Sequence, residues 1–297
     1  MLAEQIRADQ IDILFDLAGH TARNRLLVFA RKPASIQITW IGYEGTTGLA
    51  AMDYILADRC AIPEGVEKYY REKVLRLPEV YVCYAPPADA PAVGPLPALT
   101  RGQVTFGSFN NLAKINPQVV AAWAEILRRV PEARLVLKYR GLNDAGTRCR
   151  YTELFAAQGI ESARLELLAW SAYAEMLAEY QRIDIALDPF PFSGGVTTCE
   201  ALWMGIPVIT WPGETFAGRH SLSHLSNIGL TETIARDLDE YVKLAAALAG
   251  DLSRLARIRA GLREQVASSP LCDGERFAAN LMSLLRAVWS QWTSRAQ

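Results

Sequence analysis

Residues 104–140 read VTFGSFNNLAKINPQVVAAWAEILRRVPEARLVLKYR, and this stretch decides the fold. Its first part, 104–110, predicts a strand because it is rich in β-branched and aromatic residues. Pro117 opens an amphipathic stretch that predicts a helix over 117–130, and 134–140 predicts a second strand. A strand, a helix and a strand in this order are typical of parallel βαβ connectivity.

The same alternation continues through the following 70 or so residues. Further strands are expected at 164–170, 183–190 and 207–213, with helices at 151–160, 172–183 and 197–205. Such a series predicts a doubly wound parallel sheet with helices on its faces. Two further helices, a loop at 268–274 and a final helix are expected after residue 227.

The residues before this series also predict an α/β lobe, but one that is short of strands. Strands are expected at 11–17, 35–43 and 52–58, with helical stretches at 2–10 and 23–31. A proline- and alanine-rich stretch, 84–102, marks a linker. We therefore expect an incomplete first lobe with the linker at 1–95, a second lobe at 96–270, and a C-terminal helix at 271–297 that packs back on the lobes.

Composition limits the classes of function. The chain has 297 residues, 51% of them hydrophobic and 21% charged, with a net charge of −1. It should be globular, without a general attraction to nucleic acid or to an anionic membrane, so phosphate recognition must come from specific residues. Five scattered cysteines without a CxxC pair indicate reduced thiols in the cytoplasm, and three histidines without an HExxH pattern do not indicate a metal site. No signal peptide or membrane span is evident.

The first candidate site is FGSFNNLAKINP, residues 106–117, where a strand ends in small and amide residues. Ligands of open α/β sheets bind beyond the carboxyl ends of the strands, so Lys114 is placed to neutralise a diphosphate. In isolation, a solvated loop lysine would be the better interpretation. Ser108, Asn110 and Asn111 lie beside it and supply hydrogen-bonding groups, which favours a binding site.

The second candidate site is DPFPFSGGVTTCEALWMG, residues 188–205. Gly194 and Gly195 let the backbone bend closely around a ligand, and Thr197 and Thr198 fall at a helix N-terminus, where N–H groups attract phosphate. Glu200, one turn into the helix, could accept ribose hydroxyls. The alternative is an ordinary glycine turn with a threonine cap.

Two weaker candidates remain open. In WPGETFAGRH, residues 211–220, Glu214 and Arg219 either face the crevice or pair with each other. In DLAGHT, residues 16–21, His20 either transfers a proton near neutral pH or hydrogen-bonds a loop backbone.

Several long stretches, taken together and in order, resemble one family of enzymes. These stretches are 16–43, 45–54, 106–117, 183–208 and 268–274. They look like protein O-glycosyltransferases of the O-linked N-acetylglucosamine transferase and SPINDLY type, and the similarity covers nearly the whole chain. FGSFNNLAKI and TTCEALWMG resemble the SPINDLY and bacterial branch most closely.

The resemblance implies a GT-B fold with two Rossmann-like lobes that face a cleft. It also implies an inverting, metal-independent transfer of a sugar from a nucleoside diphosphate to Ser or Thr hydroxyls of proteins, without a cofactor. The implied donor is UDP-GlcNAc, with GDP-fucose as the alternative. Lys114 matches the lysine that holds the donor diphosphate, Thr197 matches a phosphate-binding threonine, and Glu200 stands where the family has a ribose-binding carboxylate.

The candidate residues then fall into three groups. Lys114 and His20 are the candidate catalytic residues. On the sugar and acceptor side the candidates are Gly45 and Thr46. The donor-binding candidates are Asn110, Asn111, Gly194, Gly195, Thr197, Thr198, Glu200 and Arg219.

The sequence also departs from the family pattern. Gly195 and Val196 replace a His and a Thr of the animal enzyme, while Met176 and Glu179 replace a histidine and an arginine near the nucleotide, so the donor stays open. Family members carry further strands, with an active-site histidine, before residue 12. A non-catalytic nucleotide-sugar-binding or scaffold protein and a small-molecule glycosyltransferase are therefore alternatives, and the incomplete lobe predicts self-association.

Overall fold

The computed structural model describes residues 2–296, and internal contacts divide the chain into two units. The first unit comprises the chain up to Cys83, the short segment Thr215–Ala217, and the chain from Asp273 onward. The second unit comprises Tyr84–Glu214 and Gly218–Cys272. No helix within residues 2–296 has both the length and the apolar character needed to cross a bilayer.

The boundary between the units differs from the expected one, because residues 84–95 belong to the second unit rather than the first. Backbone carbonyls of this proline-rich segment accept hydrogen bonds from side chains of the second unit. Arg263 donates to Pro91 at 2.7 Å, and Arg259 donates to Gly94 at 2.9 Å. A segment that cannot form regular structure is thus held by side chains, which composition alone does not reveal.

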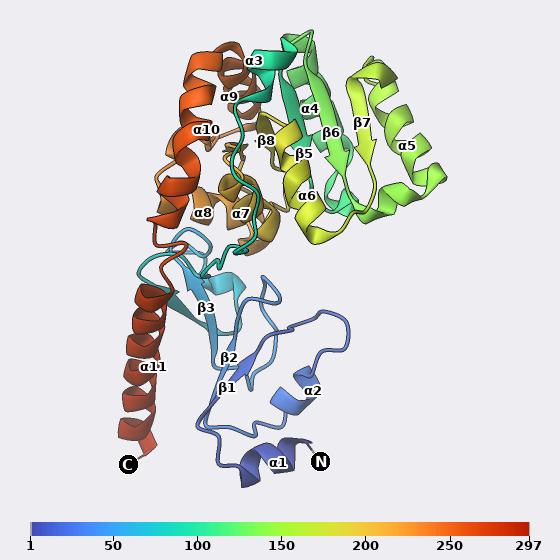
Figure 1. The fold of residues 1–297 in the computed structure, drawn as a ribbon. Coiled ribbons are helices and arrows are strands. Elements are labelled where there is room, and N and C mark those ends of the chain that lie inside the picture. Colours follow the sequence, from blue (N-terminus) through green and yellow to red (C-terminus); the bar gives the residue numbers. More distant parts are fainter. Residues whose placement is uncertain (1, 297) are drawn as a thin grey trace. The chain divides into compact units, whose positions relative to one another are not determined.

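The second unit is built on a five-stranded parallel sheet, which confirms the predicted doubly wound arrangement (Figure 1). The strand order is β7-β6-β5-β8-β9. The strands are β5 (Thr105–Ser108), β6 (Arg134–Lys138), β7 (Leu165–Leu168), β8 (Ile185–Leu187) and β9 (Val208–Ile209). Because the chain runs outward from β5 to β7 and then returns to β8 on the other side, the topological switch point lies between β5 and β8.

Two groups of helices pack in this unit. Helix α4 contacts α5 and α9, and helix α7 contacts α8 and α10. Asn116 caps α4 by accepting hydrogen bonds from the N–H groups of Gln118 and Val119, and Pro117 follows at the first helical position. The bounds are α3 Pro97–Arg101, α4 Pro117–Arg129, α5 Ala145–Ala156, α6 Tyr173–Glu179, α7 Val196–Trp203, α8 His220–Ile228, α9 Leu238–Gly250 and α10 Leu252–Ala267.

Short 3-10 helices connect several elements. They are η1 Glu67–Tyr69, η2 Leu112–Lys114, η3 Arg140–Asn143, η4 Ser162–Arg164, η5 Tyr180–Arg182, η6 Phe216–Gly218 and η7 Thr231–Thr233. Helix η2 matters most for function, because it ends at Lys114 directly after β5.

The first unit contains a four-stranded parallel sheet in the order β1-β2-β3-β4. The strands are β1 (Ile13–Asp16), β2 (Ile36–Thr39), β3 (Tyr54–Asp58) and β4 (Lys73–Leu77), and the helices are α1 (Leu2–Ala8) and α2 (Leu26–Phe29). Three strands confirm the prediction, but β4 was not predicted. Its short sequence KVLRL carries two charges, and it becomes a strand by pairing in parallel with β3 at the edge of the sheet.

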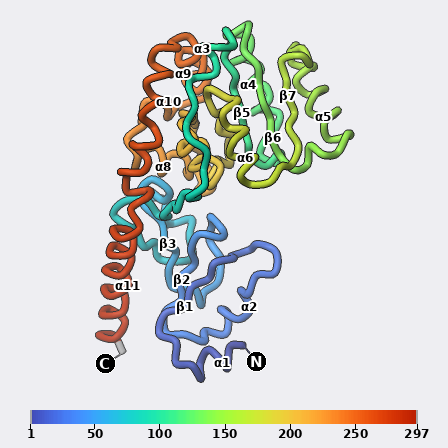
Figure 2. The backbone as a smooth tube through the Cα atoms, viewed as in Figure 1, coloured from blue at the N-terminus to red at the C-terminus, as the bar shows by residue number. Residues whose placement is uncertain are grey.

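The C-terminal helix α11 (Gly274–Ala296) packs on strand β4 of the first unit, and Figure 2 shows this red helix beside the blue strands. The rings of Trp40 and Phe277 stack with centroids 5.9 Å apart, and Val288 is buried in the same cluster. The helix therefore covers an apolar face of this sheet.

Candidate functional site at the carboxyl ends of the strands

The switch point of the second unit is crossed by the Lys114 side chain. Lys114 follows β5, and its Nζ donates a hydrogen bond of 2.7 Å to the carbonyl oxygen of Ser193 in the loop after β8. The same ammonium group lies 4.0 Å from the ring centroid of Phe192. The two loops that the sequence singled out separately are thus joined by one cation.

The loop after β8 is shaped by Asp188 and Gly194. The Asp188 carboxylate accepts hydrogen bonds from the Gly194 N–H at 2.6 Å and from the Thr210 hydroxyl at 2.7 Å. A Cβ atom on Gly194 would lie 2.6 Å from Thr198 Oγ1, so a side chain there would displace the hydroxyl groups that border the turn. Gly195 has open space at the same point, so the close approach belongs to Gly194 alone.

Burial raises the pKa of Asp188 to about 6. The hydrogen bonds from Thr210 and Gly194 act in the opposite direction, and the nearby positive charge of Lys114 also lowers the pKa. The carboxylate is therefore ionised at neutral pH and can hold the glycine turn.

The two threonines at the start of α7 are used differently. Thr197 Oγ1 donates to Asn110 Oδ1 at 3.1 Å, which ties α7 to the end of β5. Thr198 is buried, and its hydroxyl donates to the Gly194 carbonyl at 3.0 Å and bonds Ser221 Oγ at 2.8 Å. Thr198 thus shapes the turn from inside, whereas the sequence had suggested that it holds phosphate directly.

Asn111 and Arg219 also serve the loops in which they lie. Asn111 Oδ1 accepts a 3.0 Å hydrogen bond from the Ala113 N–H, which fixes the short helix that ends at Lys114. Arg219 Nε donates to the Gly213 carbonyl at 2.9 Å, so its loop is held by a backbone contact. Both residues therefore stabilise the conformation of the site.

Two histidines of α8, His220 at its start and His224 one turn further on, are buried and neutral. Burial is the main reason that the pKa of His220 falls to about 3 and that of His224 to about 4. The backbone N–H of His220 donates to Ser193 Oγ at 3.0 Å, which brings α8 to the same turn as α7. Within residues 2–296, no three His, Cys, Asp or Glu side chains gather as metal ligands would.

A cavity of about 390 Å³ opens next to Thr197 and Glu200. Glu200 is buried, and burial raises its pKa to about 7, while the hydroxyls of Tyr173 and Tyr180 oppose this rise. Four of the lining residues are aromatic, and Lys138 of the lining forms an ion pair with Glu179. The lining residues are Phe109, Lys138, Tyr139, Arg140, Ala169, Trp170, Ser171, Tyr173, Met176, Thr197 and Glu200.

Sequence reasoning missed several residues of this site, notably Asp188, Phe192, Lys138 and Trp170. A usable signal was present, because each of them ends or follows a strand of the predicted parallel sheet. What the sequence did not show is which of these strand ends are neighbours in the sheet.

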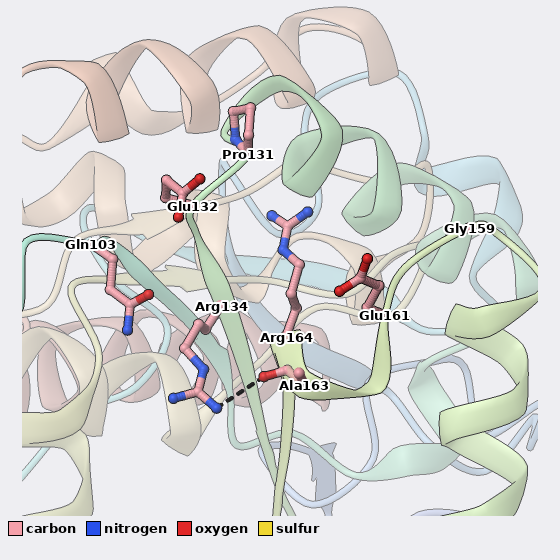
Figure 3. A pocket seen from close by; sticks show the side chains of 8 residues that line it. All are labelled: Gln103, Pro131, Glu132, Arg134, Gly159, Glu161, Ala163 and Arg164. Carbon is pink, nitrogen blue, oxygen red and sulfur yellow. Dashed lines mark hydrogen bonds between the residues drawn. The ribbon is translucent and has the colours of Figure 1, made fainter.

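A second hollow of about 460 Å³ lies at the opposite edge of the same sheet, where β6 and β7 begin (Figure 3). Its arginines are engaged in local structure: Arg134 donates to the Ala163 carbonyl at 2.9 Å, and Arg164 donates to the carbonyls of Leu127, Val130 and Ala133. Ligands of open α/β sheets bind at the carboxyl ends of the strands, so we assign the functional site to the edge that carries Lys114.

In the first unit, His20 is exposed and its Nε2 lies 2.9 Å from the Thr47 carbonyl oxygen. A carbonyl oxygen only accepts, so His20 Nε2 is the donor in this contact. The loop with Gly45 and Thr46 is anchored by buried Glu72, which accepts from the Thr46 hydroxyl and the Thr47 N–H, each at 2.7 Å. His20 therefore does hydrogen-bond a loop backbone.

The chain has two parallel α/β units, and the second carries a cation and a helix N-terminus at its switch point, beside the cavity next to Glu200. This arrangement is that of a GT-B glycosyltransferase fold. Comparison with known proteins identifies the family. The sequence pattern of glycosyl transferase family 41 matches residues 1–84 and 97–281, and the chain belongs to this family.

Curated relatives and a solved structure agree with this assignment. The chain is 43% identical over 98% of its length to proteins described as probable UDP-N-acetylglucosamine–peptide N-acetylglucosaminyltransferase SPINDLY from Petunia hybrida and Arabidopsis thaliana. It covers 31% and 32% of these relatives, about a third of their length. A mutant of Thermobaculum terrenum O-GlcNAc transferase matches all of this chain with a TM-score of 0.94 and 40% identity, and 56% of that structure is covered.

Proposed function

We propose that this chain is the catalytic region of a protein O-glycosyltransferase that transfers a sugar from a nucleoside diphosphate to Ser or Thr hydroxyls of acceptor proteins. The observation that carries the proposal is the bridge from Lys114 to the Ser193 carbonyl, at the turn where helix α7 begins. A diphosphate bound there meets an ammonium group and the positive end of a helix. The donor is UDP-GlcNAc, and GDP-fucose is the second choice.

The proposed reaction is an inverting displacement. The acceptor hydroxyl oxygen attacks the anomeric carbon on the face opposite the diphosphate, and the bond from that carbon to the phosphate oxygen breaks with its electron pair on the diphosphate. The hydroxyl proton passes to a base, for which His20 Nδ1 is the candidate in this chain. Lys114 and the helix N-terminus stabilise the negative charge that develops on the leaving group, which supports a metal-independent reaction.

The donor site is divided by function. Lys114 and the Gly194 turn would hold the diphosphate, while Thr197 and Asn110 border it. Glu200 would accept the ribose hydroxyls beside the aromatic cavity, which would take the nucleobase. The scattered, odd number of cysteines supports a cytoplasmic setting.

The test is a calorimetric binding panel with UDP, GDP, UDP-GlcNAc and GDP-fucose, followed by a peptide transfer assay. We expect Lys114→Ala to weaken binding of the preferred pair by about 10- to 100-fold, because a charge-assisted contact to phosphate is lost. Lys243→Ala, which removes an exposed lysine of α9, is the control and should bind like the wild type.

The outcomes separate the proposal from its rival. Binding that depends on Lys114 together with sugar transfer supports the enzyme. Binding without transfer to any peptide selects a nucleotide-sugar-binding protein instead, and equal binding by Lys114→Ala and the wild type refutes the donor site.

A further inference from the structure

All five parallel strands of the second unit are followed by an aromatic residue at the functional edge of the sheet. Phe109 follows β5, Tyr139 follows β6, Trp170 follows β7, Phe190 and Phe192 follow β8, and Trp211 follows β9. An aromatic ring at the carboxyl end of a strand offers a flat apolar face at the place where ligands of this sheet type bind.

The positions of most of these aromatic rings are explained by the cavity that they line or by the rings that they pack against. Phe109, Tyr139 and Trp170 line the cavity beside Glu200. Trp211 packs edge-on against Phe190, with ring centroids 4.9 Å apart.

Phe192 is different because it does not line that cavity, although the residue is 42% exposed. Its ring instead lies beside the Lys114 ammonium group, 4.0 Å from the centroid. Its other aromatic neighbour is His220, with ring centroids 6.2 Å apart. An aromatic ring that is partly open to solvent therefore lies beside the charge that would hold a diphosphate.

The order of groups along one segment gives this ring a place in the donor site. From Phe192 to Glu200 the chain passes through the Gly194 turn and the start of α7. Glu200 and the cavity stand at one end, Lys114 contacts the loop at the other end, and the turn lies between them. A nucleotide sugar has the same linear order of nucleoside, diphosphate and sugar.

We propose that Phe192 is the platform on which the sugar ring of the donor stacks, and that it is a specificity-determining residue of this enzyme. The inference rests on the proposed function, because it takes the diphosphate to lie at Lys114. The C–H bonds on one face of a pyranose carry partial positive charge and pack on the negative face of an aromatic ring. Phe192 would therefore select sugars that present such an apolar face to the ring.

The test compares a nucleoside diphosphate with its sugar conjugate, using UDP against UDP-GlcNAc and GDP against GDP-fucose. For each variant, calorimetry gives the ratio of the two dissociation constants for the pair that binds more tightly. This ratio cancels effects on the nucleoside, which both compounds share. We expect Phe192→Leu to reduce the gain from the sugar by about three- to tenfold, and Phe192→Tyr to retain it, because the ring is kept.

Trp170→Leu is the matched control, since it removes an exposed aromatic ring at the cavity end. It should weaken both members of a pair equally and leave the ratio unchanged. An unchanged ratio in Phe192→Leu, or a wild-type chain that gains nothing from the sugar, overturns the inference while the donor site stands. Absence of binding by all four compounds overturns the donor site and the inference together.

Discussion

Glu200 is a buried carboxylate whose pKa is raised by burial from 4.5 to about 7, and its replacement by glutamine gives a direct test of the site. Between pH 4.5 and about pH 7, Glu200 holds a proton in the folded chain that it has released in the unfolded chain. The stabilising contribution of this proton is complete below about pH 4.5 and is lost as the pH rises through about 7. The difference in pKa corresponds to on the order of 3 kcal/mol of unfolding free energy.

Glutamine keeps the size of Glu200 but does not titrate. The unfolding free energy of the wild type minus that of Glu200→Gln should therefore fall by about 2 to 3 kcal/mol between pH 5 and pH 8.5. Urea denaturation of the ligand-free chains, followed by tryptophan fluorescence, measures this difference at each pH. Titration of Asp188 occurs in both chains and cancels.

Glu264→Gln provides the control, because Glu264 is exposed on α10. Its difference from the wild type should stay constant with pH. A constant difference for Glu200→Gln as well, to within about 0.5 kcal/mol, would refute the reasoning that burial controls this carboxylate.

Two further predictions concern the same site. The affinity for the preferred nucleotide sugar should rise between pH 6 and pH 8 in the wild type but not in Glu200→Gln, because the ionised carboxylate is the better acceptor for ribose hydroxyls. Calorimetry at several pH values measures this affinity, and equal pH profiles for the two chains would contradict the prediction. Asp188→Asn should destabilise the chain by about 1 to 3 kcal/mol at pH 7, because the amide group replaces one acceptor oxygen by a donor. The same change should speed hydrogen exchange of the Gly194 backbone amide, and an unchanged exchange rate would show that Asp188 does not hold the turn.

Much of the second unit followed from local sequence. The strand and helix pattern over 104–140 was sufficient because its apolar spacing, its Asn-Pro helix start and its β-branched strands agree with one another. The glycine pair before α7 and the lysine after β5 were also found from the sequence, because both lie directly after predicted strands. Strand β4 was missed because its charged five-residue sequence becomes a strand only beside β3.

By itself, the sequence determined the doubly wound α/β class and the two loops that carry the site, because hydrophobic periodicity and turn residues act over a few neighbouring positions. Tertiary structure alone decided that Lys114 contacts Ser193 and Phe192. Ser193 lies 79 residues further along the chain than Lys114. It also decided that Gly194, but not Gly195, lacks room for a side chain. These contacts depend on strand order, which places β8 beside β5, and on the burial that sets the pKa values of Asp188 and Glu200.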